Sequence, residues 1–199
     1  MSKLLIILTW LCFSDLAYSL DFGSYRMEGV LGWDGRENIL GLNVDKDVSD
    51  KRHYLGLAFA TGKGKHEGIE ADDYRVVETQ LYRLGFAYSY FPFENYNIVL
   101  RLGEHLVWTE GTLMASDDQS SPKQNVGSLY GLRTMFSIGQ RVPIYDIILG
   151  LDFGVGFNHM KSDVSENEDL QNLGAVRNFK SSRDKLTMLI GFLVGWKWD

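Results

Sequence analysis

The chain lacks the cysteine pairs that usually stabilise a small secreted domain. It also lacks an apolar run long enough to cross a membrane as a helix. Its 199 residues include one cysteine, Cys12, and three prolines. A single cysteine excludes an internal disulfide framework. The apolar run from Leu4 to Phe13 is about ten residues long, too short for a membrane-spanning helix, and no later segment reaches the required length. The net charge of -6, without a basic aromatic patch, argues against nucleic-acid binding.

The N-terminus has the layout of a secretory signal peptide. Lys3 precedes the apolar run, and Ala17 and Ser19 place small residues at the -3 and -1 positions of a cleavage site. We therefore expect residues 1–19 to be a signal peptide and residues 20–199 to be one mature domain. Cys12 would then be removed together with the signal peptide. An exported chain without disulfides needs another source of stability, and we expect a membrane to supply it.

Glycine and aromatic residues are abundant instead. The chain has 21 glycines and 13% Phe, Trp and Tyr, which favours strands separated by turns. In the last segment, Leu186 to Trp198, one parity carries large apolar residues and the other carries mostly small ones. Successive strand residues point to opposite faces, so this alternation predicts a strand with one apolar face. Eight segments alternate in this way, and we predict strands over residues 25–33, 39–44, 53–61, 75–90, 98–108, 126–138, 147–157 and 186–198.

The size of the side chains predicts which face points outward. A narrow eight-stranded barrel has room inside for small residues and a few paired charges, whereas bulky apolar residues fit outside, against lipid. Aromatic residues are predicted to form two girdles at the two membrane interfaces. The girdle at one end is formed by Tyr88, Tyr90, Trp196 and Trp198. The girdle at the other end is formed by Trp33, Phe59, Trp108, Tyr130 and Phe157.

The connections between the predicted strands alternate in length from the third strand onward. Long polar connections cover residues 62–74, 109–125 and 159–184, and short turns lie between them. The first hairpin departs from this pattern, because its turn around Gly35 is tight and the following turn is longer. Long loops at one end and short turns at the other are typical of bacterial outer-membrane barrels, with both termini on the short-turn, periplasmic side.

In the number of its predicted strands, their alternation and their connections, the mature chain resembles the small eight-stranded outer-membrane proteins, the class of the OmpA membrane domain, OmpX and OmpW. The last strand is similar to the C-terminal signal read by the outer-membrane assembly machinery. The matching residues are Phe192, Val194, Trp196 and Trp198. Asp199 follows the last aromatic residue, where that signal usually ends on the aromatic itself. The predicted fold class is an all-β, eight-stranded antiparallel up-and-down transmembrane β-barrel.

The resemblance implies an integral protein of the outer membrane of a Gram-negative cell. It implies a non-catalytic role, either structural in the envelope or in surface interactions through the long loops. The implied partners are outer-membrane lipid, lipopolysaccharide and, during biogenesis, the assembly machinery, and the chain is expected to be monomeric. A soluble lipocalin-like ligand binder is the alternative fold. It would need a covering helix after the strands and usually a disulfide.

Charged residues on the small-residue faces are the first functional candidates. We predict a lumen charge cluster of Glu28, Arg83, Arg101, Arg133 and Asp152. The cluster can be read as a selectivity-setting lumen or as ion pairs that plug a barrel too narrow to conduct. In either case Arg133 and Asp152 are predicted to lie within salt-bridge range. Glu104 falls on the apolar parity, either at a bulge near Gly103 or facing outward close to an interface.

A lipid A-modifying hydrolase is the alternative function from another class. His159 and Ser162 begin the longest connection, but their spacing places them on opposite faces of an extended chain. His66 and His105 lack a serine and an acid at triad spacing. Acidic pairs such as Asp72-Asp73 specify no coordination geometry. We therefore predict no catalytic residues, no cofactor and no metal site.

Overall fold

A computed structural model describes residues 25–35, 37–49, 51–70, 73–93, 98–114, 124–164, 172–184 and 186–198. Within these ranges, only the backbone is described for residues 69, 70, 73, 74, 183, 184, 197 and 198. The predicted signal peptide and its cleavage site lie outside the described residues. No helix in the described part of the chain is long and apolar enough to cross a membrane.

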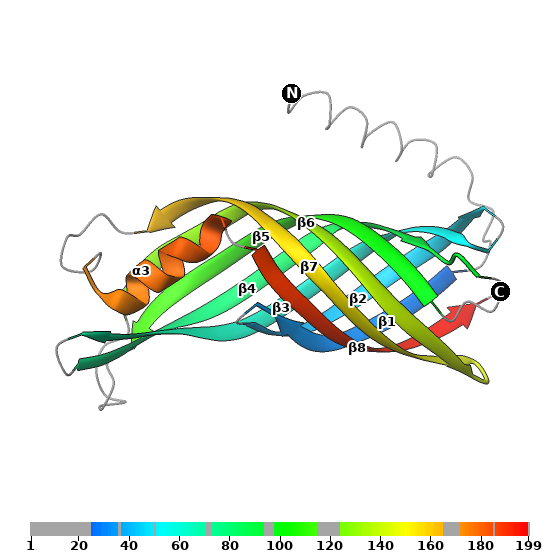
Figure 1. Ribbon diagram of the computed structural model, residues 1–199, viewed down its shortest axis with the longest axis horizontal. Helices are drawn as coiled ribbons and strands as arrows, with labels where there is room; N and C mark the ends of the chain where they lie inside the picture. Colours follow the sequence, from blue (N-terminus) through cyan, green and yellow to red (C-terminus); the bar gives the residue numbers. More distant parts are fainter. Residues whose placement is uncertain are drawn as a thin grey trace, which may run out of the picture.

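Eight antiparallel strands close into a barrel. Each strand pairs with its sequence neighbours, and β8 pairs with β1. The strands are β1 (Tyr25–Asp34), β2 (Glu37–Ser49), β3 (His53–Glu70), β4 (Asp73–Tyr90), β5 (Ile98–Met114), β6 (Gln124–Ile144), β7 (Ile147–Val164) and β8 (Leu186–Trp198). They wind around one long axis in Figure 1. The predicted fold class is confirmed.

The connections differ from the prediction. β3 and β4 continue as a hairpin through most of residues 62–74, and β5, β6 and β7 also extend beyond their predicted ends. The predicted loops at 62–74, 109–125 and 159–184 are therefore wrong over much of their length, although residues 115–123 and 165–171 lie outside the described part. The turn between β2 and β3 is short, because β2 reaches Ser49 before β3 begins at His53.

We name the two ends of the barrel by their connections. At the turn end, Tyr145 and Asp146 join β6 to β7, and β8 ends beside them. At the loop end, on the left of Figure 1, the β3–β4 hairpin and β5 to β7 rise well above β1, β2 and β8. The barrel wall is therefore tall on one side and low on the other.

A short helix covers the inside of the tall wall. Helix α3 (Gly174–Lys180) is followed by the 3-10 helix η1 (Ser181–Asp184). The helix buries Ala175, Val176 and Phe179, and it packs mainly against β3 and β4. A side chain at Gly68 of β3 would overlap the backbone of Ala175, so glycine permits this close approach. The predicted loop over residues 159–184 is therefore wrong for residues 174–184.

Candidate functional site: the filled lumen and its rim

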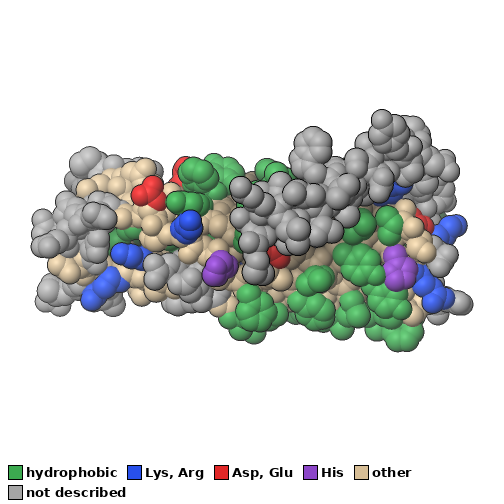
Figure 2. Space-filling model, turned by 90° about the horizontal axis from the view of Figure 1, so that it is seen from above, with side chains coloured by type: hydrophobic (Ala, Val, Ile, Leu, Met, Phe, Trp, Pro, Cys, Tyr) green, Lys and Arg blue, Asp and Glu red, His purple; other side chains and the backbone are tan. Residues whose placement is uncertain are grey.

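The outward faces of all eight strands carry large exposed apolar side chains. One example from each strand is exposed by 48% to 63%: Leu31, Leu40, Phe59, Leu84, Leu106, Phe136, Phe153 and Phe192. Figure 2 shows hydrophobic side chains gathered along the middle of the visible face and basic side chains toward both ends. Apolar surface of this extent around a whole barrel requires a lipid environment, so the chain spans a membrane. We call this surface the lipid belt.

Eight of the nine predicted girdle residues lie on the outward face. Those exposed by 38% to 59% are Trp33, Phe59, Tyr88, Trp108, Tyr130, Phe157 and Trp196. Tyr90 is partly buried and stacks on His53, with ring centroids 4.8 Å apart. The side chain of Trp198 is not described, and its backbone pairs with Tyr25. Among the predicted assembly-signal residues, Phe192, Val194 and Trp196 also face outward.

Beyond the loop-end girdle the outward faces become polar. On β3, Phe59 is followed on the same face by Thr61, Lys63 and Lys65. On β5, Trp108 is followed by Glu110. The tall part of the wall therefore stands outside the lipid belt, in water, and its apolar residues face inward onto α3. The buried cluster there includes Val77, Leu81, Leu113, Val126, Leu129, Met160, Val164 and Phe179.

Three arginines and three carboxylates form an ionic layer across the lumen toward the turn end. We call this the lower network, and it consists of Arg26, Glu28, Asp45, Arg101, Arg141 and Asp152. Arg101 is the central member. Its Nη2 lies 2.8 Å from Glu28 Oε2 and 3.2 Å from Asp45 Oδ2, and its Nη1 lies 3.4 Å from Asp152 Oδ2. Buried charges need such partners, and here the charges balance.

Two aromatic rings close the lumen below the lower network. Phe91 lies just after β4, yet it is only 2% exposed, and its ring packs edge-on against Tyr54 at 5.5 Å. The guanidinium of Arg26 lies 4.6 Å from the Tyr54 ring centroid and 4.7 Å from that of Phe91. A cation over two ring faces is favourable where water is excluded.

A second ionic layer lies nearer the loop end. Asp34 Oδ2 accepts hydrogen bonds from Nη1 of both Arg83 and Arg133. Arg133 Nε also donates to Asn158 Oδ1. These charged side chains are at most 8% exposed. Two guanidiniums thus share one carboxylate, and we call this group the upper cluster.

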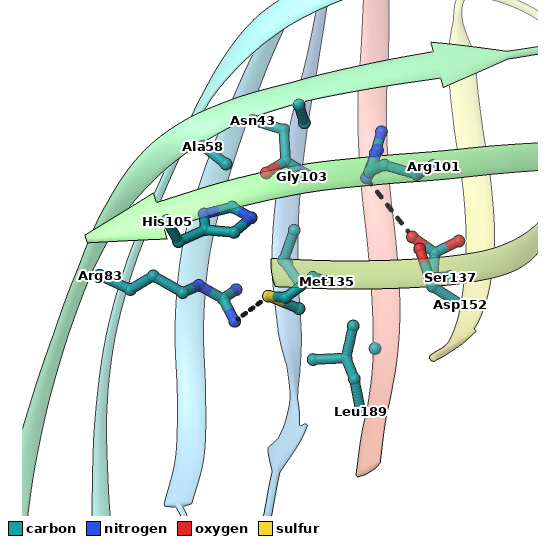
Figure 3. Close-up of a pocket in the computed structure, with 13 residues that line it drawn as sticks. Asn43, Ala58, Arg83, Arg101, Gly103, His105, Met135, Ser137, Asp152 and Leu189 are labelled. Carbon is teal, nitrogen blue, oxygen red and sulfur yellow. Dashed lines mark hydrogen bonds and ion pairs between the residues drawn. The ribbon is translucent and has the colours of Figure 1, made fainter. Parts of the chain in front are cut away.

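A small cavity separates the two ionic layers. Its volume is about 40 Å³, and it is lined by Arg83, Arg101, His105, Met135 and Asp152, among others. Figure 3 shows the Arg83 guanidinium directed at Met135, with the His105 ring next to Arg83 and with Arg101 and Asp152 on the other side. The volume suits a few water molecules, each needing about 10–15 Å³. The two ionic layers, the aromatic pair and the α3 cap together fill the described lumen, as expected for eight strands.

The structure places all five predicted lumen charges inside the barrel but divides them between two layers. Glu28, Arg101 and Asp152 belong to the lower network, and Arg83 and Arg133 belong to the upper cluster. The prediction that Arg133 pairs with Asp152 is wrong. The register explains the error, because Arg133 lies opposite Asn158 and Asp152 lies opposite Gly139, six positions along β6.

Four charged residues of the two ionic layers are absent from the lumen cluster that the sequence predicts. Asp34, Asp45 and Arg141 lie one to three residues beyond the predicted ends of their strands, and Arg26 lies inside the predicted strand 25–33 but is absent from the predicted cluster. Each of them has the inward parity of its strand. Extending the alternation by one to three residues finds Asp34, Asp45 and Arg141, and Arg26 already shares the parity of Glu28 within its predicted strand.

Glu104 faces the lipid belt. Its neighbours on the same face of β5, Leu102 and Leu106, are 53% and 62% exposed. The register runs without a shift past Gly103, which rules out a bulge there. The Thr134 hydroxyl on β6 donates a hydrogen bond of 2.8 Å to Glu104 Oε2. Glu104 therefore lies well inside the belt rather than at its edge.

The residues considered for hydrolysis do not converge. His159 is exposed on the outer face of β7, while the hydroxyl oxygen of Ser162 is buried on the inner face without a hydrogen-bond partner in the described chain. His66 packs against Phe179, and His105 lies in the small cavity. Within the described residues, no group of three or more His, Cys, Asp and Glu side chains could hold a metal ion.

Comparisons with known proteins agree with this architecture. No protein-family model matches the chain, and no curated protein matches it. Among solved structures, the chain is similar to a major outer membrane protein from Thermus thermophilus, with a TM-score of 0.57, 11% identity and coverage of 88% of this chain and 99% of that one. It is also similar to Ail, the attachment invasion locus protein of Yersinia pestis, with a TM-score of 0.50, 9% identity and coverage of 88% and 97%. At these identities the likeness shows the fold, that of the small outer-membrane barrels.

Proposed function

We propose that this protein is an integral outer-membrane barrel without a catalytic role, which acts structurally in the envelope or through the tall wall that it presents outside the membrane. The observation that carries the proposal is the combination of a filled lumen with a folded extension beyond the lipid belt. The ionic layers, the aromatic pair and α3 occupy the path that a solute would take. The extension is the part of the protein that can meet partners in water.

The same surfaces support the proposed contacts. We propose that the lipid belt meets the acyl chains of the outer membrane, and that the exposed side chains of Lys63 and Lys65, beyond Phe59 on the outward face of β3, contact lipopolysaccharide head groups. The outward face of β8, with Phe192, Val194 and Trp196, supports recognition by the assembly machinery. The absence of a convergent nucleophile, base and acid among the described residues favours a non-catalytic role.

Site-directed labelling of cysteine variants tests this placement in intact cells. Lys65→Cys places a thiol on the exposed face of the tall wall, and Tyr145→Cys places one at the turn end, where Tyr145 is 99% exposed. A membrane-impermeant maleimide is expected to label Lys65→Cys in intact cells and Tyr145→Cys only after permeabilisation. The reverse pattern contradicts the orientation. Recovery of a soluble periplasmic protein without a heat-dependent gel shift contradicts the membrane placement and favours the lipocalin-like alternative.

Planar-bilayer recordings and lipid analysis test the remaining parts of the proposal. The filled lumen is expected to produce no steady conductance, and a stable open level would mean that the ionic layers move aside. The mass spectrum of lipid A is expected to be the same with and without expression of the protein. A new deacylated species that disappears in His159→Ala would establish the hydrolase instead.

A further inference from the structure

The low side of the barrel wall leaves an open rim at the loop end. β1 and β2 meet in the tight turn at Gly35, whose N–H donates a hydrogen bond of 2.8 Å to the carbonyl of Met188. β8 begins at Leu186, opposite Phe157, whereas β7 continues to Val164. Above this edge, the described chain has no strand between the inside of the barrel and its lipid-facing side.

A cavity of about 270 Å³ lies at this rim and is lined from both faces of the wall. The lipid-facing lining consists of Trp33, Leu186 and Met188, which are 40%, 57% and 63% exposed. The inward-facing lining includes Arg133 and Asn158. One end of the cavity is thus continuous with the lipid belt, and the other reaches the upper cluster. We call it the rim pocket.

Arg133 gives the inner end of the rim pocket the chemistry to hold an anion. Its Nε and Nη1 are used by Asn158 and Asp34, but its Nη2 donates to no described residue, although the side chain is only 3% exposed. The Asp34 carboxylate is already shared with Arg83. Glu37 also lines the pocket but has partners of its own, with its Oε1 lying 3.4 Å from Thr79 Oγ1.

We propose that the rim pocket binds a single-chain anionic amphiphile. Its carboxylate or phosphate accepts a hydrogen bond from Arg133 Nη2, and its chain leaves past Trp33 and Met188 into the outer leaflet. A guanidinium with a donor to spare favours an anion, because charge-assisted hydrogen bonds are the strong ones. The apolar mouth favours an acyl chain, since the same side chains already face lipid. This inference rests on the proposed membrane-spanning placement.

Native mass spectrometry of the full mature protein in phosphatidylcholine nanodiscs tests the proposal. The probes are palmitate, palmitoyl lysophosphatidic acid and uncharged hexadecanol. A one-to-one complex is expected with at least one of the two anions. Met188→Trp, which fills the mouth, is expected to abolish it. The matched control Phe153→Trp, on the neighbouring strand β7 and within the lipid belt, is expected to leave it intact.

A second variant tests the head-group contact. Arg133→Lys keeps a positive charge opposite Asp34 but removes the spare Nη2 donor, so the anion should bind about tenfold more weakly. Whichever anion binds more tightly identifies a free fatty acid or a phosphorylated lipid as the source. Equal binding of hexadecanol and the anions, or a complex retained in Met188→Trp, overturns the proposal. Protein that fails to enter the nanodisc contradicts the membrane placement itself, whereas inserted protein that binds nothing contradicts only this inference.

Discussion

Asp34 Oδ2 accepts hydrogen bonds from both Arg83 and Arg133, and it is the only carboxylate that ion-pairs with either arginine among the described residues. Asp34 is on β1, Arg83 on β4 and Arg133 on β6, so one side chain links distant parts of the wall across the lumen. These two ion pairs contribute to the stability of the folded barrel. The main cost of losing it comes from leaving two buried guanidiniums without an ionised partner.

Asp34→Asn should therefore destabilise the barrel strongly. We expect the free energy of unfolding to fall by about 3–5 kcal/mol, the range for breaking a buried ion pair from one side. Urea unfolding in lipid vesicles, followed by tryptophan fluorescence, measures this change. Asp163→Asn is the matched control, because Asp163 is exposed on the outer face of β7. Equal stability of the two variants would show that the arginines do not depend on Asp34.

Double-mutant cycles distinguish the observed ion pairs from the one expected from the sequence. Asp152 Oδ2 accepts a 3.1 Å hydrogen bond from Arg141 Nη2, whereas Arg133 belongs to the other layer. The cycle of Arg141→Met with Asp152→Asn should show a coupling energy within about 0.5–3 kcal/mol. The cycle of Arg133→Met with Asp152→Asn should be additive to within about 0.5 kcal/mol. Strong coupling in the second cycle would contradict the division into two layers.

The barrel could be predicted because strand alternation is a local signal. The face of each residue follows from its parity alone, so segments such as 147–157 and 186–198 predicted both a strand and its lipid-facing side. Which charges meet inside a barrel depends instead on the stagger between strands. Arg133 and Asp152 were predicted to pair from their distance to the turn end, and the register places them in different layers.

Helix α3 is a second feature that could not be predicted from the sequence. Residues 174–180 contain the sequence GAVRNFK, which has too few apolar residues for a clear helical period. The helix is stabilised by burying Val176 and Phe179 against the inner face of the tall wall. That contact exists only once β3 to β7 have extended beyond the membrane. A short helix that is stabilised by tertiary packing therefore cannot be predicted from local sequence patterns.

Glu104→Leu should stabilise the protein. Glu104 lies within the lipid belt, and its one hydrogen-bond partner among the described residues is Thr134. A charge on the lipid face costs up to about 2–4 kcal/mol for Arg or Lys and less for Glu, so we expect a gain of about 1 kcal/mol in unfolding free energy. Glu110→Leu is the matched control, because Glu110 is on the same strand beyond the loop-end girdle, and it should change stability little. A destabilised Glu104→Leu variant would indicate that Glu104 has a partner in the membrane.

Phe179→Ala should loosen the α3 cap while leaving the membrane barrel folded. Phe179 is fully buried, stacks edge-on with His66 at 5.5 Å, and lies in the cluster outside the lipid belt. Removing a buried Phe side chain costs about 3–5 kcal/mol, but this cost falls on contacts beyond the ionic layers. Limited proteolysis should therefore cut residues 172–184 faster than in the unsubstituted protein, while the heat-dependent gel shift persists. Lys180→Ala, which changes a partly exposed residue at the end of the same helix, should leave the cleavage rate unchanged. Loss of the gel shift in Phe179→Ala would mean that the cap and the barrel fold as one cooperative unit.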